Sequence, residues 1–151
     1  PCTYLLCEIK RAEDSTSTKY CYKNQDFHHA EVKFLNDNIF SQGKPCSVTW
    51  YLSWSPCGEC STEIVEFLKK YPDVSLTIYI ARIYYHKQEE NREGLRTLKE
   101  SGVNIQVMTN SDYKYCWETF VMDKEGIIYA PTEKFQWFTE LEDILEVGTQ
   151  T

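Results

Sequence analysis

Apolar side chains in the first third of this chain come in short stretches separated by polar turns, a pattern typical of β-strands. Residues 4–10 form the first stretch, and residues 19–23 follow it across a polar turn at 13–18. These two stretches are predicted to pair as a hairpin. Residues 47–52 (SVTWYL) form a third predicted strand because β-branched and aromatic residues dominate it.

The middle of the chain alternates between apolar strands and an amphipathic helix. Residues 74–83 (VSLTIYIARI) form a near-continuous apolar run, as expected for a strand that is covered on both faces, and residues 103–108 form another. Between them, residues 89–101 have helical periodicity that ends at Gly102. Alternation of strands and helices from 47 to 108 predicts right-handed crossovers and parallel pairing of the later strands.

Further helices are predicted on either side of this region. Residues 29–38 form a short one, and another begins at Ser55-Pro56, with serine at the cap and proline at the first helical position. Ser111 is expected to cap a third. The last predicted helix has an apolar face made of Phe138, Leu141, Ile144 and Leu145. The predicted fold is α/β, a five-stranded mixed β-sheet flanked by helices on both faces in three α-β-α layers.

Length and composition are consistent with one globular domain. The 151 residues, of which 42% are hydrophobic, suffice for one compact domain over 1–151 and are too few for two. No run approaches the roughly 20 apolar residues that cross a bilayer, and no signal-peptide pattern opens the chain, so no membrane partner is expected. A start at Pro1 without methionine is typical of a trimmed chain. The chain has seven cysteines, and most of the five outside the C-x-x-C pair lie in apolar segments, which favours reduced thiols and a cytoplasmic or nuclear protein.

The net charge of −7 argues against tight non-specific binding to nucleic acid, which usually needs a basic footprint. Acidic side chains are concentrated after residue 117, whereas basic side chains are scattered through the first 92 residues. A local basic groove is compatible with this distribution.

Chemically reactive side chains are concentrated in His29-Ala30-Glu31 and in Pro56-Cys57-Gly58-Glu59-Cys60. One imidazole and two thiolates fill three positions of a tetrahedral zinc site and leave the fourth for water, the layout of catalytic zinc. The spacing H-x-E … P-C-x-x-C is similar to the signature of zinc nucleobase deaminases. In that chemistry zinc lowers the pKa of water towards neutrality, and the glutamate carries protons without binding the metal.

The spacing of these residues also predicts where they lie. Cys57 and Cys60 are expected on one face of a first helical turn, where the positive end of the helix favours thiolates. His29 meets them if two helix N-termini converge. Glu31 reaches the same site only if the site lies over the end of its helix. A structural zinc site is the alternative, and it would need a fourth ligand, for which His28, His86, Cys46 and Cys21 are candidates.

Residues around these motifs extend the match. The segments TWYLSWSPCGEC (49–60), ARIY (81–84), EGLRTL (93–98) and YCWETFV (115–121) resemble the AID/APOBEC polynucleotide cytidine deaminases. Within this family, LSWSPCGECS and YIARIYYH are most similar to the apolipoprotein B messenger-RNA editing branch. The resemblance covers residues 29–121 almost without gaps and implies a cytidine-deaminase-like fold.

The resemblance implies zinc-dependent hydrolytic deamination of cytosine to uracil in a single-stranded polynucleotide, with DNA favoured over RNA. It implies Zn²⁺ as the cofactor, His29, Cys57 and Cys60 as its ligands and Glu31 as the general acid/base. The substrate-binding residues that it implies are Asn24, Thr3, Trp54, Ser55, Arg82, Tyr84, Tyr85 and His86. Tyr84 would pack against a flipped base, and residues 84–88 would read the base on its 5′ side. The implied assembly is a monomer or weak oligomer.

Departures from the family pattern lie outside the zinc motif. The N-terminal helix, its basic residues and the basic tail are missing, and residues 127–132 (IIYAPT) replace an F-x-P-W-type segment. Two alternatives remain open: a zinc-folded domain that binds nucleic acid or protein without catalysis, and a deaminase of free nucleosides. Glu31 argues against the first, and the SWSPC run with the aromatic residues at 84–86 argues against the second.

Overall fold

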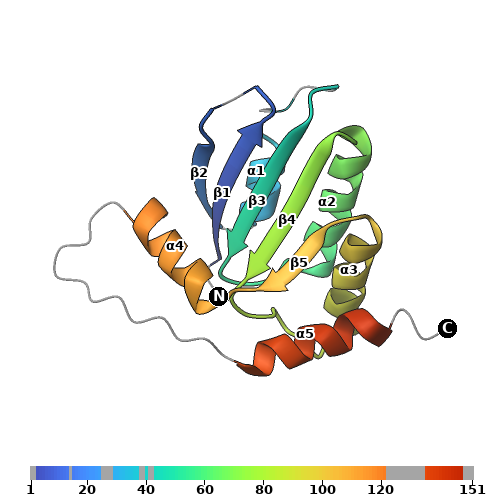
Figure 1. Cartoon of the computed structure of the whole chain (residues 1–151). Helices are drawn as coiled ribbons and strands as arrows, with labels where there is room; N and C mark the ends of the chain where they lie inside the picture. Colours follow the sequence, from blue (N-terminus) through green and yellow to red (C-terminus); the bar gives the residue numbers. More distant parts are fainter. Residues whose placement is uncertain are drawn as a thin grey trace.

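The computed structural model describes residues 3–13, 15–24, 29–37, 40, 43–121 and 135–147 (Figure 1). The helices and strands within these ranges are, in chain order, β1 (Tyr4–Arg11), β2 (Thr18–Lys23), α1 (Ala30–Leu35), β3 (Cys46–Leu52), α2 (Gly58–Lys70), β4 (Val74–Ile80), α3 (Glu89–Glu100), β5 (Asn104–Val107), α4 (Asn110–Phe120) and α5 (Phe135–Val147). Every predicted strand and helix is therefore found, with shifted ends. The IIYAPT segment at 127–132 lies outside the described residues.

The five strands form one mixed sheet in the order β2-β1-β3-β4-β5. β1 is antiparallel to β2 and to β3, whereas β3, β4 and β5 are parallel. The register pairs Leu52 with Ile80 and Ile80 with Val107, so the carboxyl ends of the three parallel strands meet at one edge. In open α/β sheets, ligands bind outside this edge.

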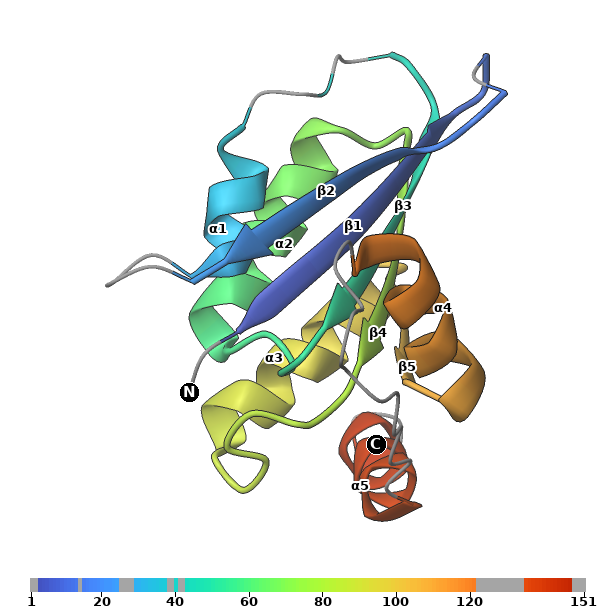
Figure 2. The ribbon, with the colours of Figure 1, turned by 90° about the vertical axis from the view of Figure 1, so that its left-hand side faces the viewer.

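Helices cover both faces of the sheet, as predicted (Figures 1 and 2). α1, α2 and α3 lie on the face that carries most of the core, where the rings of Phe34 and Trp50 meet edge to face at 5.1 Å. α4 lies on the opposite face, where Tyr115 and Phe120 pack against Tyr51. α5 packs against α3 and β5. The burial pattern of β3, alternately buried and less buried, matches a strand with one face on the main core.

The predicted start of the helix that carries the cysteines was wrong. α2 begins at Gly58 rather than at Pro56, and its N-cap is Cys57, whose sulfur accepts a hydrogen bond from the Cys60 backbone N–H. Ser55 does not cap this helix because its backbone and hydroxyl are bonded to the chain after β4. A serine hydroxyl can cap a helix only when it is not already hydrogen-bonded to another segment of the chain.

Two other predicted boundaries also differ. Thr109, not Ser111, caps α4 through a capping box. The Asp112 N–H donates to the Thr109 hydroxyl, and the Thr109 N–H donates to the Asp112 carboxylate. β4 ends at Ile80 rather than at 83, since the chain turns away from the sheet after Ala81 bonds to Leu52. Among the described helices, none has both the length and the apolar composition required to cross a membrane.

Candidate metal centre

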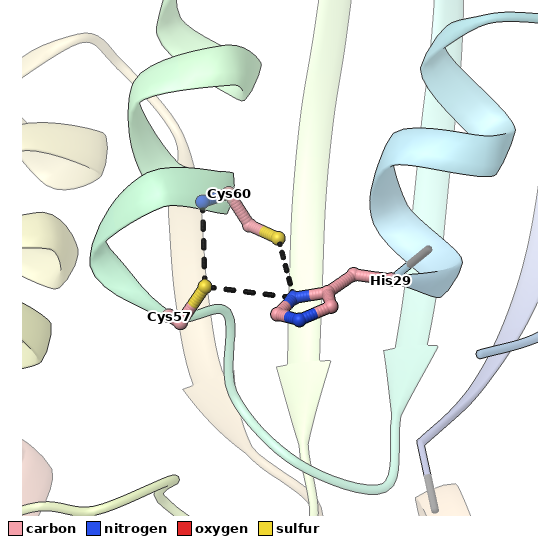
Figure 3. A group of neighbouring side chains, drawn as sticks. All are labelled: His29, Cys57 and Cys60. Carbon is pink, nitrogen blue, oxygen red and sulfur yellow. Dashed lines mark hydrogen bonds between the residues drawn. The ribbon is translucent and has the colours of Figure 1, made fainter. Parts of the chain in front are cut away.

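Three predicted ligands meet where α1 and α2 begin (Figure 3). His29 is the N-cap of α1, Cys57 is the N-cap of α2, and Cys60 lies in the first turn of α2. Their ligand atoms all lie within 4.8 Å of one another. The convergence of two helix N-termini, which the spacing required, is therefore present.

The distances suit a tetrahedral metal ion. His29 Nδ1 is 3.1 Å from Cys60 Sγ and 3.6 Å from Cys57 Sγ. Bonds of about 2.3 Å to sulfur and about 2.0 Å to nitrogen at tetrahedral angles place these atoms about 3.5 Å apart. The three side chains thus fit zinc with little rearrangement, and they leave a fourth position for a non-protein ligand. His29 would bind through Nδ1, because this is the nitrogen that faces both sulfurs.

The surroundings of the two cysteines favour a shared negative charge. The hydrogen bond from the Cys60 thiol, together with the Cys60 backbone N–H, lowers the pKa of Cys57 to about 5. The same hydrogen bond and burial raise the pKa of Cys60. These surroundings therefore favour the thiolate form at Cys57, and a coordinated cation would favour loss of the proton from Cys60 as well.

Glu31 lies beside the three candidate ligands without belonging to their group. Its side chain is 3% exposed, and its Oε2 is 3.9 Å from Cys60 Sγ. Burial raises the pKa of the Glu31 carboxyl to about 7, against a smaller opposing effect of backbone hydrogen bonding. Because Glu31 is the second residue of a helix that starts over the site, it reaches the same space as His29 despite diverging from it around the helix.

A cavity of about 170 Å³ opens in front of this group. The lining residues are Thr3, Asn24, His29, Glu31, Ser55, Cys57 and Tyr84. All seven are among the residues predicted from the sequence as ligands, general acid/base or substrate contacts. The tertiary structure therefore collects them in one place, although their individual roles stay predictions.

Backbone hydrogen bonds hold two parts of this lining. Thr3 and Asn24 are tied to each other, because the Thr3 N–H donates to Asn24 Oδ1 at 2.9 Å and the Asn24 N–H donates to the Thr3 carbonyl at 3.0 Å. Ser55 is 4% exposed and accepts a hydrogen bond from the Tyr84 N–H at 2.8 Å. This part of the lining is thus assembled from the two chain segments at the open end of the β1–β2 hairpin and from the two turns after β3 and β4.

Four predicted contacts do not line the cavity itself. The Arg82 guanidinium lies over the Trp54 ring at 4.9 Å, and this ring meets Tyr84 edge to face at 6.4 Å. Tyr85 is 54% exposed, and its ring is 4.5 Å from that of Tyr84. His86 packs against Trp137 of α5 at 5.3 Å, away from the cavity lining. The rings of Trp54 and Tyr85 consequently border the cavity through their contacts with Tyr84. Arg82 adjoins it through Trp54, whereas His86 contacts α5.

None of the described candidates for the fourth ligand of a structural site lies at this centre. In the described part of the chain, the group that could hold a metal consists of His29, Cys57 and Cys60. Cys46 begins β3 at the end of the sheet opposite Leu52, and Cys21 is exposed on β2. His28 lies outside the described residues. Among the described candidates, the structure therefore favours an open three-ligand site.

Asn91 is a structurally important residue that the sequence pattern does not single out. Its side chain is 4% exposed and bonds both to Gly58 and to the loop after β4. An asparagine among the polar residues at the start of a helix carries no signal that separates it from a solvated one. Only its burial identifies it.

Comparison with known proteins agrees with this geometry. A family model described as APOBEC4-like -AID/APOBEC-deaminase matches residues 2–123. The chain is 45% identical over 139 residues to the C->U-editing enzyme APOBEC-1 of Mus musculus, with 89% of this chain and 58% of that protein covered. It is 43% identical over 137 residues to the enzyme of the same name from Homo sapiens, covering 88% and 55%, and 42% identical over 141 residues to that of Monodelphis domestica, covering 89% and 59%.

The chain thus spans a little over half the length of these curated relatives. The family model covers all three metal-site residues, Glu31 and the whole cavity lining. The resemblance noted from the SWSPC run and its flanking segments is confirmed, and this chain belongs to the AID/APOBEC deaminase family.

Proposed function

We propose that this chain is the catalytic domain of a zinc-dependent deaminase that hydrolyses cytosine to uracil in single-stranded polynucleotides, with DNA preferred to RNA. The observation that carries the proposal is the placement of Glu31, a buried carboxylate in the same cavity as His29 and Cys57 and outside the ligand set. Membership of the AID/APOBEC family and similarity to proteins named C->U-editing enzymes support it.

Zinc is the proposed cofactor because an imidazole and two thiols at these distances match its preferred donors. His29, Cys57 and Cys60 would hold the ion. When bound, zinc supplies a Lewis acid that makes water a nucleophile near neutral pH.

Glu31 is proposed to carry protons between the attacking water and the base. The carboxylate is buried beside the cavity, where a proton that it accepts from water can be passed on to the substrate. In this reaction the first proton taken from water would go to the ring nitrogen, and the second, from the hydroxyl then attached to C4, would go to the amine, which leaves as ammonia while the C4 carbonyl of uracil forms. His29 and the two cysteines would not serve in this role, because the metal would occupy the lone pairs with which they accept protons.

The cavity suits a single planar base. Its volume of about 170 Å³ is well below the roughly 300–1,000 Å³ of pockets for drug-sized ligands. Tyr84 gives it an aromatic wall, and Asn24, Thr3 and Ser55 add polar groups. A base that has been turned out of its stack fits such a pocket.

A polymer rather than a free nucleoside is proposed as the substrate because recognition groups continue beyond the cavity. Arg82 over the Trp54 ring offers a cation beside an aromatic surface, and the exposed Tyr85 ring lies next to Tyr84. Aromatic and cationic groups in this arrangement stack on bases and contact phosphates of single strands. We assign them to the nucleotides that flank the target.

We also propose a cytoplasmic or nuclear location. All six cysteines in the described part of the chain are unpaired thiols, and a zinc site with two thiolates requires them reduced. A thiol-selective label applied before lysis checks this proposal, since oxidised cysteines would escape labelling.

The decisive experiment uses a single-stranded DNA oligonucleotide with one cytosine, its RNA counterpart and free cytidine as substrates. The parent protein is compared with Glu31→Ala at matched zinc content. Uracil formed from DNA by the parent, and a loss of at least a thousandfold in Glu31→Ala, is the expected result.

Other outcomes discriminate among the alternatives. Product from cytidine but from neither oligonucleotide would replace the proposal with a free-nucleoside deaminase. One bound zinc per chain with no product from any substrate would replace it with a binding domain without catalysis. Faster turnover of RNA than of DNA would overturn the DNA preference alone.

A further inference from the structure

The geometry points to Asn91 as a positioning residue that fixes the loop at 84–88 against the metal-ligand end of α2, and thereby sets where a substrate base lies relative to the metal centre. This inference rests on the proposed deaminase function. Asn91 does not line the cavity and acts through the residues that do.

One side chain joins the two segments. Asn91 Oδ1 accepts a hydrogen bond from the Gly58 N–H at 3.0 Å, and Nδ2 donates to the carbonyls of Tyr84 at 3.3 Å and Tyr85 at 3.4 Å. Because one partner is a backbone donor and the others are backbone acceptors, the orientation of the amide follows from the network. Gly58 directly follows the ligand Cys57, and Tyr84 is the aromatic wall of the cavity.

The loop needs such support. Tyr85 has a φ of 39°, in the left-handed region that residues with a side chain rarely adopt. Three successive carbonyls of the loop accept hydrogen bonds from α3, because Arg92 Nη1 also donates to the His86 carbonyl at 3.0 Å. The conformation that turns the Tyr84 ring towards the cavity is therefore stabilised from the first turn of α3.

Close packing makes the bridge to α2 feasible. A Cβ on Gly58 would lie 2.6 Å from Glu90 Cγ and 2.9 Å from the Glu90 carbonyl oxygen, so only a glycine allows α2 to begin this near to α3. At that separation the short Asn91 side chain spans the gap. Tyr84 is consequently held on both sides of its backbone, by Ser55 at its N–H and by Asn91 at its carbonyl.

Two substitutions separate the two halves of the bridge. Asn91→Asp keeps an oxygen acceptor for Gly58 but replaces the donor with an oxygen that repels the loop carbonyls. Asn91→Ala removes both halves. Asn104→Ala is the matched control, because Asn104 is exposed at the start of β5 and bonds only to the neighbouring Gln106 among its described hydrogen bonds.

Each zinc-loaded variant is measured in three ways. Residue-resolved hydrogen exchange follows the amides of Gly58, Tyr84 and Gln88, zinc content is titrated, and kcat and KM are determined with DNA oligonucleotides that differ only in the base 5′ of the cytosine. Thermal denaturation verifies that each variant is folded.

In Asn91→Asp we expect hydrogen exchange at the Tyr84 and Gln88 amides to accelerate at least tenfold while the Gly58 amide stays protected. Zinc content should remain at one ion per chain. KM should rise about tenfold, with a smaller change in kcat. The preference among 5′ bases should weaken as well. In Asn91→Ala, exchange at Gly58 accelerates too. Asn104→Ala should match the parent in every measurement.

Unchanged exchange at Tyr84 and Gln88 in both Asn91 variants would overturn the inference, as would unchanged KM and 5′ preference in an active enzyme whose loop exchanges faster. Failure of the proposed function looks different. In that case the parent forms no uracil, and the exchange and zinc measurements, which need no turnover, still decide whether Asn91 holds the loop.

Discussion

The hydroxyl of Ser55 accepts a hydrogen bond from the backbone N–H of Tyr84 at 2.8 Å, which ties the turn after β3 to the loop after β4. A second bond, from the Ser55 N–H to the Arg82 carbonyl at 2.8 Å, joins the same two segments. Both turns leave the carboxyl edge of the sheet, so this pair of bonds determines how the polar and aromatic sides of the cavity face each other.

Replacement of Ser55 by alanine should therefore misplace Tyr84. The Tyr84 N–H loses its partner in a half-buried position, which costs about 1–2 kcal/mol of unfolding free energy. We expect kcat/KM on a cytosine-containing oligonucleotide to fall by about tenfold or more, because small displacements at a reacting site are costly. Urea unfolding measures the loss of stability, and steady-state kinetics measure the loss of activity. The control is Ser75→Ala, because Ser75 is an exposed serine on β4. Wild-type kinetics in Ser55→Ala would show that the hydroxyl has no positioning role.

Zinc should stabilise the fold through its three ligands. At free zinc 1,000 times the dissociation constant, linkage predicts about 4 kcal/mol of added stability, which a chelator removes. Cys57→Ser should abolish this increment, whereas Cys21→Ser, an exposed thiol on β2, should retain it. Since protons compete with the metal for histidine and thiolates, the increment should shrink as the pH falls. Thermal denaturation with and without chelator at several pH values tests this, and an equal increment in both variants would contradict the assignment of Cys57.

The crossing of α2 and α3 should not accept a side chain at Gly94. A Cβ there would lie 2.8 Å from Ser61 Oγ and 3.0 Å from Ser61 Cβ, so Gly94→Ala should destabilise by about 1–3 kcal/mol despite the better helix propensity of alanine. Ser61→Gly removes both contacts, and the double variant should lose less than the sum of the single ones. Denaturant titration of the four proteins measures this coupling. A stabilised Gly94→Ala protein would show that the helices separate without cost.

Arg96 should anchor α5. Its guanidinium is 7% exposed and donates to the Ile144 carbonyl at 2.8 Å and to the Glu89 and Glu93 carboxylates at 2.8 and 2.7 Å. Arg96→Met keeps most of the aliphatic stem but leaves the Ile144 carbonyl without this donor, so we expect a loss of about 2 kcal/mol. Lys99→Met on the exposed face of α3 should change stability by less than about 0.5 kcal/mol. Proteolysis near α5 at native conditions provides a second readout, and equal sensitivity in both variants would contradict the anchoring role.

The zinc motif illustrates how much a local pattern can predict. Residue type and spacing predict His29, Cys57 and Cys60 as zinc ligands, since few other combinations satisfy a zinc ion, and the structure brings these three side chains together. The same motif predicts the role of Glu31. The boundary of α2 was predicted less well, because the Ser-Pro start that the sequence favours competes with the bonds that Ser55 makes to Arg82 and Tyr84. Those partners are 27 and 29 residues away and leave no trace in a local pattern.

The network around Asn91 illustrates the opposite case. Its bonds to Gly58, Tyr84 and Tyr85 depend on the approach of two helix N-termini, and that approach depends in turn on two glycines whose neighbours belong to another helix. Local periodicity describes which face of α3 is apolar, but it does not say which polar side chain at its start is buried.

The sequence by itself determined the order of strands and helices, the three-layer α/β architecture and the three candidate metal ligands, because each depends on residue type and on short-range spacing. The tertiary structure alone decided that Thr3, Asn24, Ser55 and Tyr84 line one cavity with Glu31, that α2 begins at Gly58, and that Asn91 is buried between α2 and the loop at 84–88. Those features arise where segments far apart in the chain compete for the same hydrogen-bonding groups and the same space, and that competition is settled only when the whole sheet and its helices have packed.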